Sequence, residues 1–215
     1  MEINYLGHSS FRFKSKKISL ITDPYDSEAV GLKYPKQVAD IVTVSHDHDD
    51  HNKSNQISGV KLVIDGPGEY EMGGVSIIGI PTYHDNKKGE LRGKNTVYII
   101  EMDGLRIAHL GDLGQKFSEK KYEILGNIDI LMIPVGGVYT IGSSEAVEIV
   151  REIEPTIIIP MHFYTPELNQ KTFAKLAKVD SFLSELGVTT EKLTKLVVKK
   201  DLLGDDQRVV LLNMK

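Results

Sequence analysis

The first half of the chain consists of short apolar runs, many of them alternating with polar residues, with turns between them. These runs predict strands at Glu2–Leu6, Ser10–Phe13, Ile18–Thr22, Asp40–Ser45, Lys61–Asp65, Val75–Ile80, Val97–Met102 and Arg106–Leu110. The Asp103-Gly104 pair between the last two strands is typical of a hairpin turn. The first half is therefore predicted to be rich in β-structure.

Helical and strand patterns alternate in the second half. In Ser143–Glu154, the residues Ala146, Val150 and Ile153 form one apolar stripe, which predicts an amphipathic helix. Further helices are predicted at Ser118–Leu125 and Asp180–Leu186, and strands at Ile128–Pro134, Thr156–Pro160 and Arg208–Leu212. No repeat or linker divides the sequence, so we expect residues 1–215 to form one α/β domain with helices outside a sheet-on-sheet core.

The most informative motif is His-Asp-His-Asp-Asp-His at residues 46–51, directly after a predicted buried strand. Side chains two residues apart on an extended segment point the same way, so His46 and His48 can hold one ion. Asp50 and His51 cannot face that same point and suit a second ion close by. Imidazole and carboxylate ligands together favour zinc, iron or manganese. The alternative, a polar surface loop rich in Asp and His, is disfavoured by the position directly after a core strand.

Other histidines follow the same rule. The chain has seven, and three of the four outside the motif lie at or just past the end of a strand-like run: His84, His109 and His162. Asp112 follows His109 by three residues. Because open α/β sheets gather reactive groups at the carboxyl ends of their strands, these residues together indicate one shared site.

The order of these residues resembles that of the metallo-β-lactamase superfamily: His-x-His-x-Asp-His, then an isolated His, an isolated Asp and a last His. The resemblance covers nearly the whole chain, and the branch it looks most like is the phosphorylated-ascorbate-lactonase-like group of predicted zinc-dependent hydrolases. The motifs that carry it are Leu6-Gly7-His8-Ser9-Ser10-Phe11, Thr22-Asp23-Pro24, Gly66-Pro67-Gly68-Glu69-Tyr70-Glu71, His109-Leu110-Gly111-Asp112, Pro134-Val135-Gly136-Gly137 and Pro160-Met161-His162-Phe163.

The resemblance implies a four-layer αββα sandwich and a dinuclear metal site. Its ligand set falls on this chain as two groups joined by a bridge: His46, His48 and His84 for the first ion, Asp50, His51 and His162 for the second, and Asp112 between them. Two zinc ions are the expected cofactors, with manganese and iron as alternatives.

The charge of such a site indicates hydrolysis. Two divalent ions bring four positive charges, and Asp50, Asp112 and a bridging hydroxide leave a net charge near plus one. This centre would lower the pKa of bound water to roughly 7, so the hydroxide could attack an ester, lactone or phosphoester bond of a small, anionic metabolite. Asp50 is the candidate catalytic residue, because it is a carboxylate beside the attacking hydroxide.

Composition restricts the partners and the compartment. Charged residues make up 26% of the chain and the net charge is −4, which argues against a general nucleic-acid binder. The chain has no cysteine, so it has no disulfide framework and no thiolate ligand. No signal peptide or membrane-spanning run is apparent. We expect a cytoplasmic protein with a small-molecule substrate and no membrane partner, and the sequence leaves homo-oligomerisation open.

Residues around the ligands are candidates for a supporting role. Asp23 could accept the distal N–H of a metal-bound histidine, with a turn acid as the equal alternative. His8, in the turn Gly7-His8-Ser9, is expected to bind substrate or to support a ligand. His109 is at least as well explained by a buried structural role as by catalysis.

Substrate-binding candidates lie in two further segments. The loop Arg92-Gly93-Lys94-Asn95 is short and basic, so Lys94 and Asn95 are expected to bind an anionic substrate, with a solvated charged hairpin as the alternative. Tyr139 could donate to a developing oxyanion, although its Gly-rich surroundings also suit a tight turn.

Two other functional classes remain open at this stage. A nuclease of the same superfamily is disfavoured by the acidic balance and by the lack of a long basic arm. A non-hydrolytic iron or redox protein is compatible with the ligand set, and metal analysis would separate it from a hydrolase.

Overall fold

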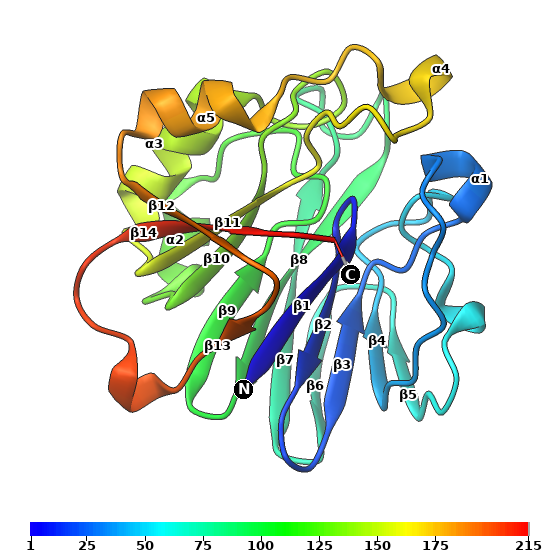
Figure 1. Ribbon diagram of the computed structural model, residues 1–215, viewed down its shortest axis with the longest axis vertical. Helices are drawn as coiled ribbons and strands as arrows, with labels where there is room; N and C mark the ends of the chain where they lie inside the picture. Colours follow the sequence, from blue (N-terminus) through cyan, green and yellow to red (C-terminus); the bar gives the residue numbers. More distant parts are fainter. Residues whose placement is uncertain (215) are drawn as a thin grey trace.

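Two β-sheets face each other in the computed structural model, which describes residues 1–214 (Figure 1). Over these residues the first sheet has six strands, in the order β13 (Leu196–Val197), β1 (Glu2–Gly7), β2 (Ser10–Lys14), β3 (Ser19–Thr22), β4 (Ile41–Thr43) and β5 (Leu62–Ile64). The second has eight, in the order β12 (Thr189–Leu193), β14 (Arg208–Leu212), β11 (Ile157–Met161), β10 (Ile130–Pro134), β9 (Leu105–His109), β8 (Lys94–Met102), β7 (Val75–Tyr83) and β6 (Gly68–Met72).

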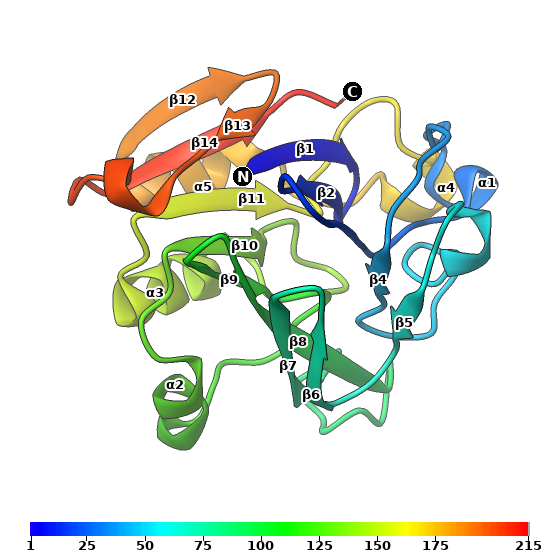
Figure 2. The ribbon, with the colours of Figure 1, turned by 90° about the horizontal axis from the view of Figure 1, so that it is seen from below.

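Helices cover both outer faces of this pair of sheets. Three pack on the second sheet: α2 (Glu119–Leu125), α3 (Ser143–Ile153) and α5 (Val179–Leu186) (Figure 2). Two short helices, α1 (Ser27–Val30) and α4 (Gln170–Phe173), lie against the outer side of the first sheet, and 3₁₀ turns occur at Ser54–Gln56 and Lys200–Leu202. The fold is the expected αββα sandwich.

Three apolar layers hold the four structural layers together. Between the sheets, Phe11 and Phe13 of β2 pack with Ile100 of β8 and other fully buried side chains. On the outer face of the second sheet, Ala146 and Val150 of α3 are buried, as the apolar stripe predicted. A third cluster packs beneath α1 and α4. Successive side chains of a strand point to opposite faces of its sheet. Because both faces of each sheet are covered, apolar side chains on both faces are buried.

The directions of the strands place the candidate site residues at one edge of the two sheets. β4 runs parallel to β3, and β9, β10 and β11 run parallel to one another. Their carboxyl ends lie at the upper edge of the molecule in Figure 1, opposite the hairpin turns. The segments that follow β4, β7, β9 and β11 carry the histidines and acids singled out in the sequence.

The predicted strands and helices are all present, but some elements were not expected. β6 was not among the predicted strands, and it pairs with β7. β8 begins at Lys94, so Lys94 and Asn95 belong to a strand and not to the predicted loop. β12, β13, α1 and α4 were also missed.

No helix among residues 1–214 is both long and apolar enough to cross a bilayer.

Candidate metal centre

The 46–51 loop and His84 form a first group of imidazoles. The rings of His46 and His48 lie 4.5 Å apart, and those of His46 and His84 lie 4.6 Å apart. One ring nitrogen of each residue falls within 4.8 Å of the others. His46 and His84 are buried, whereas His48 is exposed. Three nitrogens that converge in this way, with one side open, are what a catalytic metal site offers.

A second group lies beside the first. Asp50, His51 and His162 place their ligand atoms within 4.8 Å of one another, and His8 joins them. Asp50 Oδ2 is 3.7 Å from His51 Nε2 and 3.3 Å from His8 Nε2. His162 comes from the end of the second sheet, so this group draws on both halves of the molecule.

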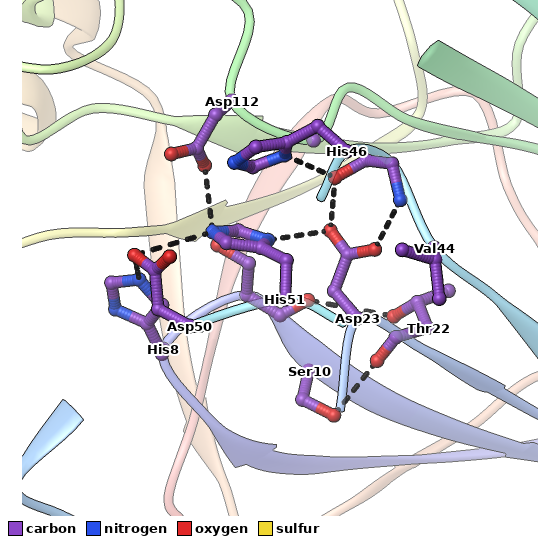
Figure 3. A network of polar contacts seen from close by, with 12 residues as sticks. His8, Ser10, Thr22, Asp23, Val44, His46, Asp50, His51 and Asp112 are labelled. Carbon is purple, nitrogen blue, oxygen red and sulfur yellow. Dashed lines mark hydrogen bonds and ion pairs between the residues drawn. The ribbon is translucent and has the colours of Figure 1, made fainter. Parts of the chain in front are cut away.

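Asp112 lies between the two groups. Its Oδ1 is 3.2 Å from His51 Nε2, and its Oδ2 is 3.2 Å from both His84 Nε2 and His162 Nε2. Its side chain is almost fully buried, and Figure 3 shows it facing His51 and His46. One carboxylate therefore faces histidines of both groups.

The donor set fits metal ions. Among residues 1–214, several buried atoms that face the centre have no hydrogen-bond partner: His46 Nε2, His51 Nε2, His162 Nε2 and Asp112 Oδ1. Leaving a buried polar atom unpaired costs about 1–3 kcal/mol, so a cluster of them needs a partner of another kind. Cations coordinated by these atoms would satisfy all of them at once.

Asp23 fixes the orientation of two of these imidazoles. Its Oδ2 accepts hydrogen bonds from His51 Nδ1 at 2.8 Å and from Ser45 Oγ at 2.7 Å (Figure 3). Because the Ser45 hydroxyl donates to Asp23, His46 Nδ1 must donate to Ser45 Oγ, which lies 3.0 Å away. Both histidines are thus held with protonated Nδ1 and with the Nε2 lone pair directed at the centre.

The carboxylates make the centre attractive to positive charge. Burial lowers the pKa of His51, but the nearby charges of Asp112, Asp50 and Asp23 raise it well above its ordinary value. Burial raises the pKa of Asp23, but the charge of His51 and its hydrogen bond lower it below the usual range. A cation at the centre would meet the same negative potential.

Asn95 positions Asp112. Its Oδ1 accepts the backbone N–H of Asp112 at 2.9 Å, and its Nδ2 donates to Thr82 Oγ1 and to the carbonyl of Leu110. The side chain is buried, so Asn95 braces the acid from behind and is not available to a substrate in the way the basic loop suggested.

His8, which belongs to the second group, has an uncommon backbone conformation. Its φ is 54°, and its Nε2 donates to Asp50 Oδ2 at 3.3 Å. Its carbonyl accepts from the backbone N–H of His162 and from the hydroxyl of Tyr5. His162 and Asp23 also have positive φ, 52° and 42°. Non-glycine residues in this region carry strain of about 1–3 kcal/mol, which commonly accumulates at functional sites.

His109 has a structural role. Its Nε2 donates to the carbonyl of Ser9 at 2.8 Å, and its Nδ1 accepts from the backbone N–H of Gly111. Both ring nitrogens are therefore used, and the ring joins the second sheet to the loop that carries His8.

Two glycines allow the chain to pass close to the ligands. A Cβ on Gly114 would lie 2.3 Å from the carbonyl carbon of His84, and one on Gly136 would lie 2.1 Å from the carbonyl oxygen of His162. Any side chain at either position would displace a histidine of the cluster. The Gly-rich turn before Tyr139 thus has a packing reason.

The remaining predicted site residues lie further out. Lys94 is exposed at the first position of β8, opposite Tyr83 in the adjacent strand. The hydroxyl of Tyr139 donates to the carbonyl of Thr172 at 2.8 Å, so it would have to break that bond to donate to an oxyanion. Ser45, Thr82 and Phe173 were not anticipated, because a lone Ser, Thr or Phe carries no sequence signal of its position next to a histidine cluster.

Two cavities lie outside the cluster. One of about 1120 Å³ is at the opposite end, lined by the hairpin turns that contain Lys16, Gly73 and Asp103. The other, of about 510 Å³, is bordered by His8 and by apolar side chains such as Phe163. His8 is the single residue of the two groups that lines the second cavity, and none lines the first.

The sequence is similar to those of known proteins over most of its length. The model of the β-lactamase superfamily domain matches residues 2–162. A metal-dependent hydrolase from Thermococcus onnurineus is 31% identical over 192 residues, covering 77% of this chain and 85% of that protein. One from Pyrococcus abyssi is 29% identical over 214 residues, covering 83% and 95%.

Solved structures agree. A metallo-β-lactamase superfamily protein from Thermotoga maritima superposes with a TM-score of 0.79 at 35% sequence identity. The match covers 98% of this chain and 97% of that one, so the two share the whole fold.

Proposed function

Because this chain belongs to the β-lactamase superfamily and is a metal-dependent hydrolase, we propose that it acts through two metal ions on an ester, lactone or phosphoester bond of a small, anionic metabolite. The observation that carries the proposal is the position of Asp112. Its two oxygens lie 3.2 Å from histidines of both groups. A bridging carboxylate offsets the repulsion between two cations, and a site for a single ion has no need of one.

The proposed ligands follow the two groups. His46, His48 and His84 would hold the first ion, Asp50, His51 and His162 would hold the second, and Asp112 would be shared between them. Three imidazoles with a carboxylate suit zinc, and manganese and iron accept the same donors. When bound, the ions supply a hydroxide nucleophile at neutral pH and polarise the oxygen under attack.

Asp50 is the proposed proton acceptor. Its side chain keeps about a fifth of its surface exposed, while the other carboxylate of the cluster, Asp112, is buried. Asp50 can therefore meet both the centre and an incoming substrate. The Nε2–H of His8 donates to Oδ2 of Asp50 and holds that carboxylate in place. His8 is itself fixed, because its carbonyl accepts a hydrogen bond from the backbone N–H of His162. These contacts support the proposal that Asp50 accepts the proton that the nucleophile releases.

The charge of the substrate is suggested by the excess of basic residues in residues 86–94, where three lysines and one arginine accompany one glutamate.

The test is a screen of the metal-loaded protein against lactones, thioesters, phosphodiesters and phosphomonoesters, beside two variants. Asp50→Asn should lose about 10²–10⁴-fold in kcat on the active class. Asp49→Asn is the matched control, because Asp49 is the neighbouring carboxylate but is exposed and pairs with Lys53. If no class is hydrolysed faster by the wild type than by Asp50→Asn, the proposal is wrong.

A further inference from the structure

Arg92 and Tyr139 meet although they come from different parts of the chain. The guanidinium carbon of Arg92 lies 5.5 Å from the centre of the Tyr139 ring. Arg92 belongs to the loop that follows His84, and Tyr139 belongs to the turn that follows β10. A guanidinium over an aromatic face is held by attraction to the π-electrons, so the contact fixes a long and otherwise mobile side chain.

The loop that carries Arg92 is rigid. Asp85, next to His84, accepts four backbone N–H groups, and those of Lys87 and Arg92 are the closest, each at 2.7 Å. The backbone N–H of His84 donates to the carbonyl of Gly93 at 3.1 Å. The position of Arg92 is thus tied to the position of a proposed metal ligand.

The support under Arg92 is equally fixed. Tyr139 donates its hydroxyl to the Thr172 carbonyl, and its ring meets the edge of Phe173 at 6.2 Å. The preceding residue, Val138, has a φ of 61°, and the N–H of Tyr139 donates to the Gly137 carbonyl at 2.6 Å. A β-branched residue seldom adopts this backbone conformation, so the tight turn is held by its surroundings and sets the direction of the tyrosine.

This support continues to the centre. The Phe173 ring lies 5.0 Å from that of His8 and 6.1 Å from that of His162. Arg92 is therefore joined to the His84 side of the centre through its own loop and to the His162 side through two aromatic rings.

The guanidinium has no acid of its own. Within residues 1–214 no carboxylate pairs with Arg92, and its side-chain N–H groups have no protein acceptor. The same loop carries the positive Lys87 and Lys88 and the negative Glu90, all exposed, so its charge is positive on balance. With one face on the ring, the edge of the guanidinium stays free, and that edge matches the two oxygens of a carboxylate or phosphate.

We propose that Arg92, held by Tyr139, is the specificity-determining residue that binds an oxyanion group of the substrate at a distance from the bond that is cleaved. The proposal rests on the proposed function in that the same substrate is hydrolysed at the metal centre. Arg92, rather than Lys94, is then the anion-binding member of the basic segment, and Tyr139 is a positioning residue.

Anion binding is measured first, without metal and without turnover. Glutarate and inorganic phosphate are titrated separately into the metal-stripped full chain by isothermal calorimetry, and the tighter of the two identifies the anion class. Arg92→Gln should weaken that binding about ten- to a hundredfold, as expected for loss of a charge-assisted pair. Lys87→Gln removes the same charge from the same loop and should change the affinity less than threefold. Equal affinity of wild type and Arg92→Gln, or no binding by the wild type at 20 mM anion, would overturn the proposal.

Variants of Tyr139 separate positioning from folding. Tyr139→Phe keeps the ring under Arg92 and should retain anion affinity, although it loses the bond to Thr172. Tyr139→Leu removes the ring and should weaken anion binding by the metal-stripped chain at least fivefold, while the metal-loaded variant keeps the metal content of the wild type. If both variants bind the anion as the wild type does, the ring does not position Arg92.

Kinetics with metal-loaded protein then distinguish the two proposals. The mono-4-nitrophenyl ester of glutarate is compared with 4-nitrophenyl pentanoate, which carries the same leaving group and no charge. Arg92→Gln should reduce the preference for the charged ester, measured as the ratio of the two kcat/KM values, at least tenfold. A preference unaffected by Arg92→Gln overturns the anion site. Failure of the wild type to hydrolyse any class in the screen, with Arg92-dependent anion binding intact, overturns the hydrolytic proposal alone.

Discussion

At the scale of single residues, the candidate metal centre depends on side chains that are not among its proposed ligands. Asp23 is the clearest case, because one carboxylate sets the ring orientation of His51 directly and of His46 through Ser45. Ligand histidines whose second nitrogen is held in this way present a lone pair of defined direction, which raises metal affinity.

Replacing Asp23 tests this arrangement. Asp23→Asn keeps the shape but removes the charge and one acceptor, so the affinity for zinc should fall about ten- to a hundredfold. Competition with a chromophoric chelator measures it, and Asp205→Asn, an exposed acid far along the chain, is the control. Wild-type affinity in Asp23→Asn would contradict the orienting role.

The sequence identified the histidines and acids of the cluster but not all of their supports. The 46–51 motif, His84, Asp112 and His162 stand at strand ends, where residue type and position together are informative. Ser45 and Thr82 act only through hydrogen bonds that form once distant segments meet. Asn95 was singled out for a charged loop, but the start of β8 turns its side chain inward to Asp112.

At the scale of elements, glycines set how closely the loops approach the ligands. Gly114→Ala should push the backbone of His84 away and lower the free energy of unfolding by about 1–3 kcal/mol. It should also weaken the binding of a metal ion by His46, His48 and His84. Gly66→Ala is the matched control, because a Cβ there meets nothing within 4 Å. Thermal unfolding and metal content are measured together. If Gly114→Ala keeps the melting temperature and the metal content of the wild type, the glycine is not required for the position of His84.

Asp40 joins three strands of the first sheet, and its role depends on pH. It accepts hydrogen bonds from the N–H and the hydroxyl of Ser19, the first residue of β3, and pairs with Lys61, which precedes β5. The ion pair with Lys61, followed by the bonds from Ser19, lowers the pKa of Asp40 below its ordinary value. Because the folded-state pKa is depressed, the stabilisation is present above the unfolded value of about 3.9 and is lost as the pH falls through the folded value.

Urea unfolding of chelator-treated protein tests this dependence. Asp40→Asn should cost about 1 kcal/mol at pH 7, and less at pH 3, where the wild-type carboxylate begins to take up a proton. The value is modest because about a quarter of the side chain is exposed. An equal cost at pH 7 and pH 3 would contradict the charged pairing.

Elements with clear apolar patterns were predictable, and those without were not. α3 and the buried strands β10 and β11 show their burial directly in the sequence. β12 reads Thr-Thr-Glu-Lys-Leu and is mostly exposed, so it forms only because β14 offers it a parallel edge. α1 and α4 are four residues long, too short for any helical period to appear.

At the scale of the whole molecule, the centre joins the two sheets. The 46–51 loop follows β4 of the first sheet, whereas His84, Asp112 and His162 follow strands of the second sheet. Metal ions there would tie the sheets together and stabilise the folded state as well as the active site.

Metal removal should therefore lower the melting temperature. At a free zinc concentration of 100 times Kd, each site adds about 2.7 kcal/mol, which corresponds to roughly 5–10 °C for a chain of this length. Circular dichroism melts of chelated and zinc-loaded protein measure the shift, and Asp112→Ala should abolish most of it. A melting temperature independent of zinc would contradict a clamp between the sheets.

The most direct test of the central claim is a crystal structure of the zinc-saturated protein recorded at the zinc absorption edge. A dinuclear centre predicts two anomalous peaks about 3.5–4 Å apart, one among His46, His48 and His84 and the other among Asp50, His51 and His162, with Asp112 between them. A single peak at saturating zinc, or two peaks that do not share Asp112, would contradict it.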